Sequence, residues 1–202
     1  METYNLGRLN DTLQLYNDDG TLERELPYTE GDYNGDYKIY GDDGQLAVVI
    51  KYEKGAVKGF TYEDKTGKLL ALIPFKSGTG KVLAYYKNGT KSAEIEFEED
   101  EVNGKRNVYF SNGKPYFEGI RIAGDDNGVK KTYYKNGQLK KEENYYYGNL
   151  HGTVKEWWDN GKPKSEEFYY DGDRHGVKKV YDNTGKLNQT FTYYFGVLQS
   201  VK

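Results

Sequence analysis

The chain has 202 residues, a formal net charge of −3 and an aromatic content of 16%, including 22 tyrosines. Disordered chains are poor in aromatic residues, so this composition predicts a folded protein rich in β-structure. The sequence contains no cysteine, which excludes disulfide bonds, thiolate catalysis and cysteine-based metal sites. It opens without a signal-peptide pattern, and no apolar run reaches the ~18 residues that span a membrane. We therefore expect a cytoplasmic protein.

One glycine recurs at nearly constant spacing along the chain. It ends eight turn-like motifs, such as Lys87-Asn88-Gly89, and successive spacings are 24, 23, 22, 24, 24, 24 and 24 residues. Two further glycine columns follow the same period, and the three columns hold 22 of the 25 glycines. This periodicity indicates tandem repeats. We assign a single repeat domain over residues 1–202, with units at 7–34, 35–58, 59–79, 80–103, 104–127, 128–151, 152–175 and 176–202.

Each repeat is predicted to be a β-hairpin. Asn-Gly and Asp-Gly motifs favour tight turns between strands, and the second connection, such as 148–152, is predicted to be the wider turn. Every connection is too short for a crossover, so neighbouring strands run antiparallel. The predicted fold is all-β: an elongated, single-layer antiparallel β-meander of about eight tandem hairpin repeats, a twisted ribbon roughly 75 Å long by strand spacing.

Repeats two and three are apolar on both faces of their second strands. These strands are predicted at Leu46–Tyr52 and Leu69–Phe75. A single-layer antiparallel sheet normally keeps one face in water. Three explanations are open: the ribbon curls, the N-terminal segment packs on it, or two copies associate through repeats two and three.

Repeat four carries a run of acidic residues at its second strand and the following turn. They are Glu94, Glu96, Glu98, Glu99, Asp100 and Glu101. The net charge is −8 over residues 1–101 and +5 over residues 102–202, so the acids lie in the acidic half. They are either an edge in contact with water or a contact for a basic partner, since acidic surfaces steer cationic proteins.

Three departures in the later repeats are candidate partner contacts. Arg121 stands in a column that is otherwise mostly tyrosine or phenylalanine, through sequence drift or to meet a ligand. Trp157 and Trp158 are adjacent, so they face opposite sides of a strand. We expect one to join the aromatic ladder and the other to be exposed, as interface tryptophans often are. Tyr145, Tyr146 and Tyr147 extend the same patch.

No catalytic set emerges from the sequence. His151 and His175 hold equivalent turn positions about 10 Å apart by strand spacing, too far for a shared metal. The pairs Glu142-Glu143 and Glu166-Glu167 point to opposite faces, so each member is expected to pair with lysines on neighbouring strands. Lysines among tyrosines could stack bases, but interspersed acids argue against nucleic acid. We expect no enzyme activity, metal, cofactor or small-molecule substrate.

Residues 133–152 and 157–176 resemble the MORN-repeat-variant unit, and the chain is similar to the bacterial YwqK-type proteins, which are described as antitoxins. The resemblance implies an antitoxin or immunity protein that neutralises a protein toxin by direct binding. Related eukaryotic MORN repeats are associated with scaffolding and membrane attachment. A structural scaffold or a membrane-surface adaptor is therefore the alternative.

Overall fold

A computed structural model describes residues 4–5, 8–17, 20–41 and 43–202 of the chain. The turn residues Asp18, Asp19 and Asp42 and the first residue of repeat one lie outside the described residues. The chain forms two compact units, unit 1 at Met1–Lys114 and unit 2 at Pro115–Lys202. A single repeat domain over the whole chain stays a prediction.

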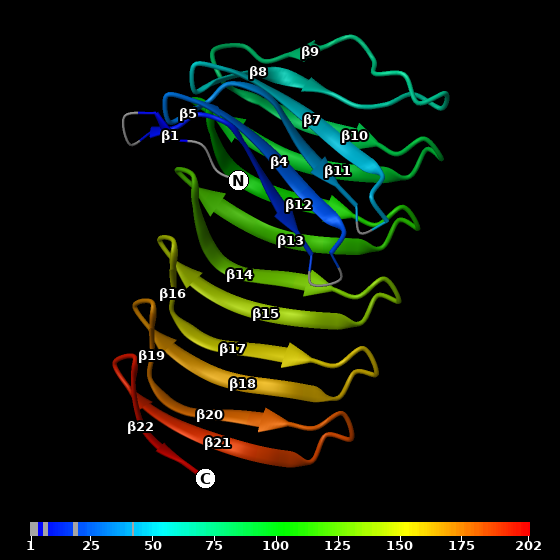
Figure 1. The fold of residues 1–202 in the computed structure, drawn as a ribbon. Helices are drawn as coiled ribbons and strands as arrows, with labels where there is room; N and C mark the ends of the chain where they lie inside the picture. The colour runs from blue at the N-terminus through cyan, green and yellow to red at the C-terminus, as the bar shows by residue number, and fades with distance from the viewer. Residues whose placement is uncertain (1–3, 6–7, 18–19, 42) are drawn as a thin grey trace. The chain divides into compact units, whose positions relative to one another are not determined.

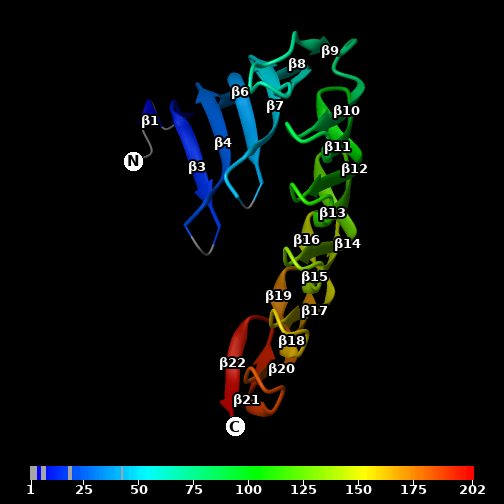
Figure 2. The ribbon, with the colours of Figure 1, turned by 90° about the vertical axis from the view of Figure 1, so that its right-hand side faces the viewer.

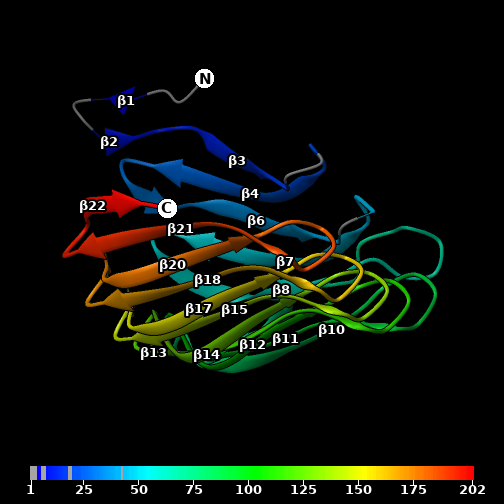
Figure 3. The ribbon, with the colours of Figure 1, turned by 90° about the horizontal axis from the view of Figure 1, so that it is seen from below.

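Unit 2 is an antiparallel meander whose strands follow one another in chain order (Figure 1). Its strands are β13 (Pro115–Ile122), β14 (Asp125–Tyr133), β15 (Leu139–Tyr146), β16 (Asn149–Leu150), β17 (Gly152–Trp157), β18 (Pro163–Tyr170), β19 (Asp173–Arg174), β20 (Gly176–Tyr181), β21 (Leu187–Tyr194) and β22 (Val197–Val201). Viewed from below, β17, β18, β20, β21 and β22 lie side by side (Figure 3). The predicted all-β meander of antiparallel hairpins is confirmed.

The two kinds of turn have the reverse of the predicted lengths. Five residues separate β17 from β18, and only the last of the Trp158-Asp159-Asn160-Gly161 turn, Gly161, has a positive φ, at 79°. The second connection joins Tyr146 to Asn149 across two residues, and both have positive φ: Tyr147 at 43° and Gly148 at 82°. Two consecutive positive φ values define the tightest hairpin turns. The prediction that the second turn is the wider one is therefore wrong.

The glycine turns are tied to the next repeat by side chains. In the Asn160-Gly161 turn, the Asn160 side-chain amide donates to the Asn183 carbonyl at 2.8 Å, while its Oδ1 accepts from the Lys162 N–H at 3.0 Å. Asn136 makes the same two bonds one repeat earlier. Because each net hydrogen bond contributes about 1 kcal/mol, these links favour stacking of consecutive repeats.

Charged side chains occupy both faces of the unit 2 sheet. On one face Glu142 pairs with Lys131 at 3.7 Å, and Glu166 pairs with Lys155 at 3.7 Å. On the other, Glu143 pairs with Lys130 of the neighbouring strand β14 at 3.8 Å and with Lys141 of its own strand at 2.8 Å. The predicted lysine pairing is confirmed, with one difference. Glu143 is 7% exposed, because the long side chains around it shield its carboxylate.

Unit 1 contains two larger groups of paired strands and a short pair. The short pair is β1 (Tyr4–Asn5) with β2 (Arg8–Leu9). The first group is β3 (Thr12–Tyr16), β4 (Leu22–Thr29), β5 (Asp32–Tyr33), β6 (Gly35–Tyr40), β7 (Leu46–Glu53), β8 (Ala56–Thr61) and β9 (Ile73–Pro74). The second is β10 (Gly80–Tyr85), β11 (Lys91–Glu98) and β12 (Glu101–Tyr109). In Figure 2, β8 and β9 lie between β7 and β10.

The apolar second face of repeat two is covered from within unit 1. Strands β10 and β11 contact β7, and the buried Ser92 hydroxyl donates to the Ala47 carbonyl at 2.6 Å. Val48, Val49 and Ile50 are at most 2% exposed. Of the three explanations, curling of the ribbon therefore accounts for repeat two, and here unit 1 has two layers rather than one.

Repeat three lacks the predicted strand at Leu69–Phe75. Strand β9 is limited to Ile73–Pro74, and Leu69, Leu70 and Leu72 are between 40% and 44% exposed. Pro74 has no N–H to give to a strand ladder, and the repeat is shorter than its neighbours. Self-association through this exposed run stays a prediction.

Candidate functional site

The acidic cluster of repeat four is largely occupied by contacts within unit 1. Glu94 pairs with Lys81 at 2.8 Å and with Lys91 at 3.1 Å, and these two ammonium groups lower the pKa of Glu94 to about 2. Glu96 accepts from the Lys105 N–H at 2.9 Å, which lowers its pKa as well. These two carboxylates lie together on β11 but have neighbouring charges to neutralise them.

The remaining acids lie at the β11–β12 turn. Glu98 bonds to the Asn103 side chain, and the Asp100 carboxylate accepts from the Val57 N–H at 2.9 Å. Glu99 and Asp100 both have positive φ, at 49° and 71°, so they form the two-residue turn. Asp100 thus serves the fold, while Glu99 and Glu101 are exposed. A role for this cluster in partner binding stays a prediction.

Arg121 and the tryptophans have structural partners in unit 2. Arg121 pairs with Asp126 at 2.7 Å. The Trp158 indole N–H donates to the Asp182 carbonyl at 3.0 Å, and Trp157 lines a hollow of about 260 Å³. Both tryptophans are half-buried, so the prediction that one is exposed is wrong. The reason is that Trp158 lies in a turn, and an aromatic side chain at this position reaches the next repeat. Tyr134, at the equivalent position one repeat earlier, does the same when its hydroxyl donates to the Trp157 carbonyl.

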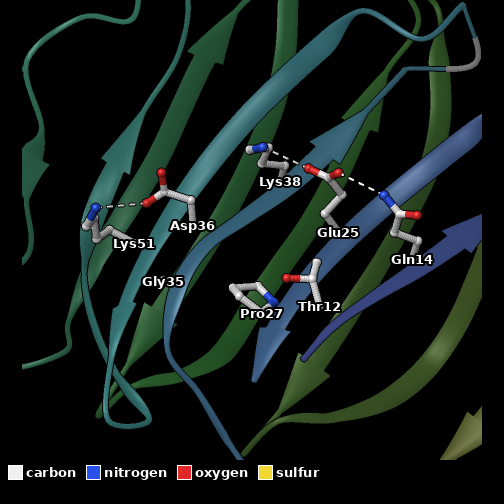
Figure 4. A pocket seen from close by; sticks show the side chains of 8 residues that line it. All are labelled: Thr12, Gln14, Glu25, Pro27, Gly35, Asp36, Lys38 and Lys51. Atoms are coloured by element: carbon white, nitrogen blue, oxygen red, sulfur yellow. Dashed lines mark hydrogen bonds and ion pairs between the residues drawn. The ribbon is translucent and has the colours of Figure 1, made fainter. Parts of the chain in front are cut away.

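A polar hollow lies on the face of β3, β4, β6 and β7 in unit 1 (Figure 4). It measures about 480 Å³ and lies over Gly35, which has no side chain to fill it. Its charges are already neutralised: Glu25 accepts from Lys38 at 2.8 Å and Gln14 at 3.1 Å, and Asp36 pairs with Lys51 at 2.9 Å. Because its charges are paired with one another, it is a weaker binding candidate than the exposed aromatic side chains of unit 2.

The two-residue turns of unit 2 carry a row of aromatic side chains. The turns before β16 and β19 lie along one edge of the unit, and the glycine turns lie along the other (Figure 1). Strands β15, β18 and β21 end on equivalent tyrosines 24 residues apart, whereas β13 ends on Ile122. We define the aromatic edge as Tyr146, Tyr147, His151, Tyr170, His175, Tyr194 and Phe195.

The rings of the aromatic edge form one continuous series. Starting at Tyr147, neighbouring centroids are 4.8, 6.1, 5.2 and 6.0 Å apart through Tyr146, His151 and Tyr170 to Phe195. His175 then lies 4.8 Å from Phe195 and 5.5 Å from Tyr194. Such separations are those of attractive aromatic pairs, so the rings support one another on the surface.

The edge is also strongly exposed. Tyr146 and Tyr194 are 61% exposed, Tyr147 is 59% and Tyr170 is 51% exposed. A contiguous exposed apolar patch on a folded protein typically marks an interaction surface. Tyr147 and Phe195 have positive φ, at 43° and 42°, which costs a bulky residue about 1 kcal/mol or more. The same φ recurs at Lys54 and Glu99 in unit 1, so the conformation belongs to the turn, while the bulky aromatic residue in it is particular to unit 2.

The tyrosines of the aromatic edge differ from Tyr133 and Tyr145 in the state of their hydroxyls. The Tyr133 hydroxyl donates to Glu118 at 2.7 Å, and that of Tyr145 donates to Glu143 at 3.3 Å, where burial raises the Tyr145 pKa. In the part of the chain described, the hydroxyls of Tyr146, Tyr170 and Tyr194 have no hydrogen-bond partner. Three phenols at the edge are thus free to donate to a partner.

Two carboxylates flank the aromatic edge. The Asp125 side chain lies beside Gly148, and the Asp173 side chain lies beside Gly196, so each is next to a turn that carries an aromatic residue. Both are exposed, and neither has an ion-pair partner within the described ranges. The edge is therefore aromatic with an acidic rim.

Sequence reasoning found only part of this surface. Tyr146 and Tyr147 were predicted as part of a contact patch, while Tyr170, Tyr194 and Phe195 were missed. The sequence signal is at one position of the repeat, the residue directly after the inward-facing aromatic residue. It is polar early in the chain, as at Glu53 and Glu98, and becomes aromatic in the last three repeats.

Two other kinds of site, a metal centre and a membrane-spanning helix, are absent from the described residues. Over residues 4–5, 8–17, 20–41 and 43–202 there is no group of three or more acidic or histidine side chains that could hold a metal ion. The same residues include no helix long and apolar enough to cross a bilayer.

Comparison with known proteins agrees with this geometry. No curated protein shows a significant match to the chain. The family model described as "MORN repeat variant" matches residues 126–145, 150–171 and 174–193. Each matched stretch contains two long strands and the glycine turn between them. Repeats six, seven and eight, which carry the aromatic edge, are therefore matched as MORN-repeat-variant units.

Proposed function

We propose that this protein binds another protein through the aromatic edge of unit 2, and that it acts as a cytoplasmic antitoxin or immunity protein. Binding itself would neutralise the toxin, so the proposal assigns no catalytic step, metal or cofactor to the chain. The MORN repeats support a binding role, and the antitoxin role rests on the resemblance of the sequence to YwqK-type proteins.

One observation carries the binding proposal: six exposed aromatic or imidazole rings, joined by the half-buried ring of His175, form a series whose tyrosine hydroxyls are unoccupied. Tyrosine is enriched among residues that dominate interface energetics, because it buries a large rigid ring and still offers a hydrogen bond. The rings occupy turns of a meander held by neighbouring strands, so little conformational entropy would be lost on binding.

The acidic rim favours a basic partner. Asp125 and Asp173 are exposed beside the aromatic turns. Unpaired surface carboxylates accelerate association with a cationic protein and give the on-rate a strong dependence on salt. A toxin with a basic surface meets this requirement.

The test uses the product of the gene adjacent to that of this chain, expressed in a bacterial host with and without the full-length protein. We expect the neighbouring product to arrest growth and co-expression to restore it, with a complex recovered by size exclusion. Replacing Tyr146 and Tyr170 by alanine should abolish both protection and the complex. Tyr16→Ala is the matched control, because Tyr16 is a 56% exposed tyrosine in unit 1.

If the neighbouring product is harmless and forms no complex, the antitoxin proposal is wrong. If protection and complex survive the double substitution, the aromatic edge is not the binding surface.

A membrane-surface adaptor is the second candidate, since exposed tyrosines also suit the interface between lipid and water. The exposed Asp125 and Asp173 argue against it, because cytoplasmic membrane surfaces are negative. Sedimentation with phosphatidylcholine vesicles containing about 30% phosphatidylserine separates the two. We expect the protein to stay in the supernatant, and pelleting with the vesicles would favour the adaptor.

A further inference from the structure

The aromatic edge has a fixed period. Tyr146 ends β15, Tyr170 ends β18 and Tyr194 ends β21, so consecutive tyrosines are two strands apart. With strands about 4.8 Å apart, the tyrosines recur every ~9.6 Å. A partner segment that meets all three in the same way must present equivalent groups at that interval.

This interval discriminates among the backbone conformations of a linear segment. A polyproline II helix repeats every three residues, or about 9.3 Å. An extended strand presents one face every ~6.7 Å, and an α-helix returns to the same face after seven residues, or ~10.5 Å. Across three tyrosines the misfit is roughly 0.6 Å for polyproline II and 1.8 Å for the α-helix. The period favours polyproline II.

Hydrogen-bond chemistry favours the same conformation. The hydroxyls of Tyr146, Tyr170 and Tyr194 are free donors within the described structure. A polyproline II segment makes no internal hydrogen bonds, and its carbonyls remain free to accept. Proline has no N–H, so such a segment is an acceptor that matches a row of donors. The pyrrolidine rings of such a segment are apolar, as the faces of the tyrosine rings are.

Charge complementarity adds a further requirement. The exposed carboxylates of Asp125 and Asp173 flank the edge about two repeats apart. A segment lying along the tyrosines brings its flanking side chains near these carboxylates. Basic side chains at its ends would be attracted, and acidic ones would be repelled.

We propose that the aromatic edge of unit 2 binds a proline-rich segment in the polyproline II conformation that carries basic residues at its ends. This inference rests on the proposed function and specifies the partner's chemistry. The segment lies across the strands, places about one turn against each tyrosine and accepts hydrogen bonds from their hydroxyls. Affinity comes from ring stacking and from a ligand that is already ordered before it binds.

The test is calorimetric titration of the full chain with a synthetic peptide of about nine prolines between two arginines, the length that spans three tyrosines. We expect saturable binding that Tyr170→Ala weakens about tenfold or more. Tyr170→Phe keeps the ring but loses the donor, so it should weaken binding by a smaller factor. Tyr16→Ala should leave the affinity unchanged.

Two matched peptides test the separate parts of the argument. Replacing alternate prolines with glycine keeps the charge but removes the ordered conformation, and should weaken binding about tenfold. Exchanging the arginines for glutamates should also weaken binding, and the loss of affinity should be larger at low salt than at high salt.

Equal affinity for the glycine-substituted peptide, or for Tyr170→Ala, would overturn the proposal, as would the absence of saturable binding. If the peptide fails while the neighbouring gene product still needs the aromatic edge, the polyproline inference is wrong and the proposed function stands. If both fail, the edge is not a binding surface.

Discussion

The same hairpin is used differently in the two units. In unit 1 the second strand of repeat two, β7, buries Ala47, Val48, Val49 and Ile50 in succession against a second layer of strands. In unit 2 the equivalent strand, β18, alternates, with Glu167 and Tyr169 buried and Phe168 and Tyr170 exposed. The repeat therefore specifies the path of the backbone, while the side chains decide whether a face is core or surface.

The two-residue turns show the contrast most clearly. The last residue before this turn is Glu53 or Glu98 in unit 1 and Tyr146 or Tyr170 in unit 2. The backbone adopts positive φ in every case, including at Lys54 and Glu99 in unit 1. Turn geometry therefore does not require an aromatic residue. This difference is why we assign the aromatic edge a binding role.

Aliphatic packing in unit 1 should produce the largest effect on stability. Ile50 is 1% exposed, so Ile50→Ala is expected to lower the free energy of unfolding by about 3 kcal/mol through lost burial and a residual cavity. Phe168→Ala, in the 39% exposed side chain of β18, should cost about 1 kcal/mol or less. Urea denaturation of the full chain measures both. Equal losses would mean that unit 1 has no special core.

Loss of a buried charge in unit 2 should produce the second largest effect on stability. Glu167 pairs with Arg174 at 2.9 Å and Lys178 at 3.3 Å, and its neighbour Glu166 lies on the opposite, open face. Glu167→Gln is expected to cost about 2 kcal/mol, because two cations then face one another without an anion. Glu166→Gln should cost ~0.5 kcal/mol or less. A reversed order in urea midpoints would contradict the assignment of faces.

Much of this architecture could be predicted from the sequence, because turn glycines and alternating strands carry local signals. Other features have no such signal. The positive φ of Tyr147 follows from how the strands meet, and the curl that covers Val49 depends on contacts between distant strands. One of the two tryptophans was expected to be exposed, because the hydrogen bond from Trp158 to the Asp182 carbonyl joins different repeats and has no local sequence signal. Tyr170 and Tyr194 could have been found by comparing equivalent columns.

Acid pH should distinguish a cluster held by ion pairs from one that is free. Lys81 and Lys91 lower the pKa of Glu94 from its ordinary 4.5 to about 2 in the folded protein. Its contribution is therefore complete above pH 4.5 and is lost as the pH falls towards 2. Glu94→Gln should cost about 1 kcal/mol or less at pH 6, and the difference from the unsubstituted protein should vanish near pH 2. A constant difference between these pH values would show that Glu94 is not ion-paired.

The smallest expected effect on stability has the opposite sign. Tyr147 occupies a left-handed conformation at φ 43°, which asparagine tolerates better than an aromatic residue. Tyr147→Asn should therefore raise the free energy of unfolding by about 0.5 kcal/mol, after the loss of its ring contact with Tyr146 is counted.

The same substitution should weaken binding of the proline-rich peptide several-fold. Lys54→Asn, at the equivalent turn position of unit 1 with φ 50°, is the matched control and should leave binding unchanged, because it lies outside the aromatic edge. A more stable variant with weaker binding would show that the strain at this turn is maintained for recognition. If Tyr147→Asn instead lowers stability and leaves binding intact, the ring at this position serves the fold.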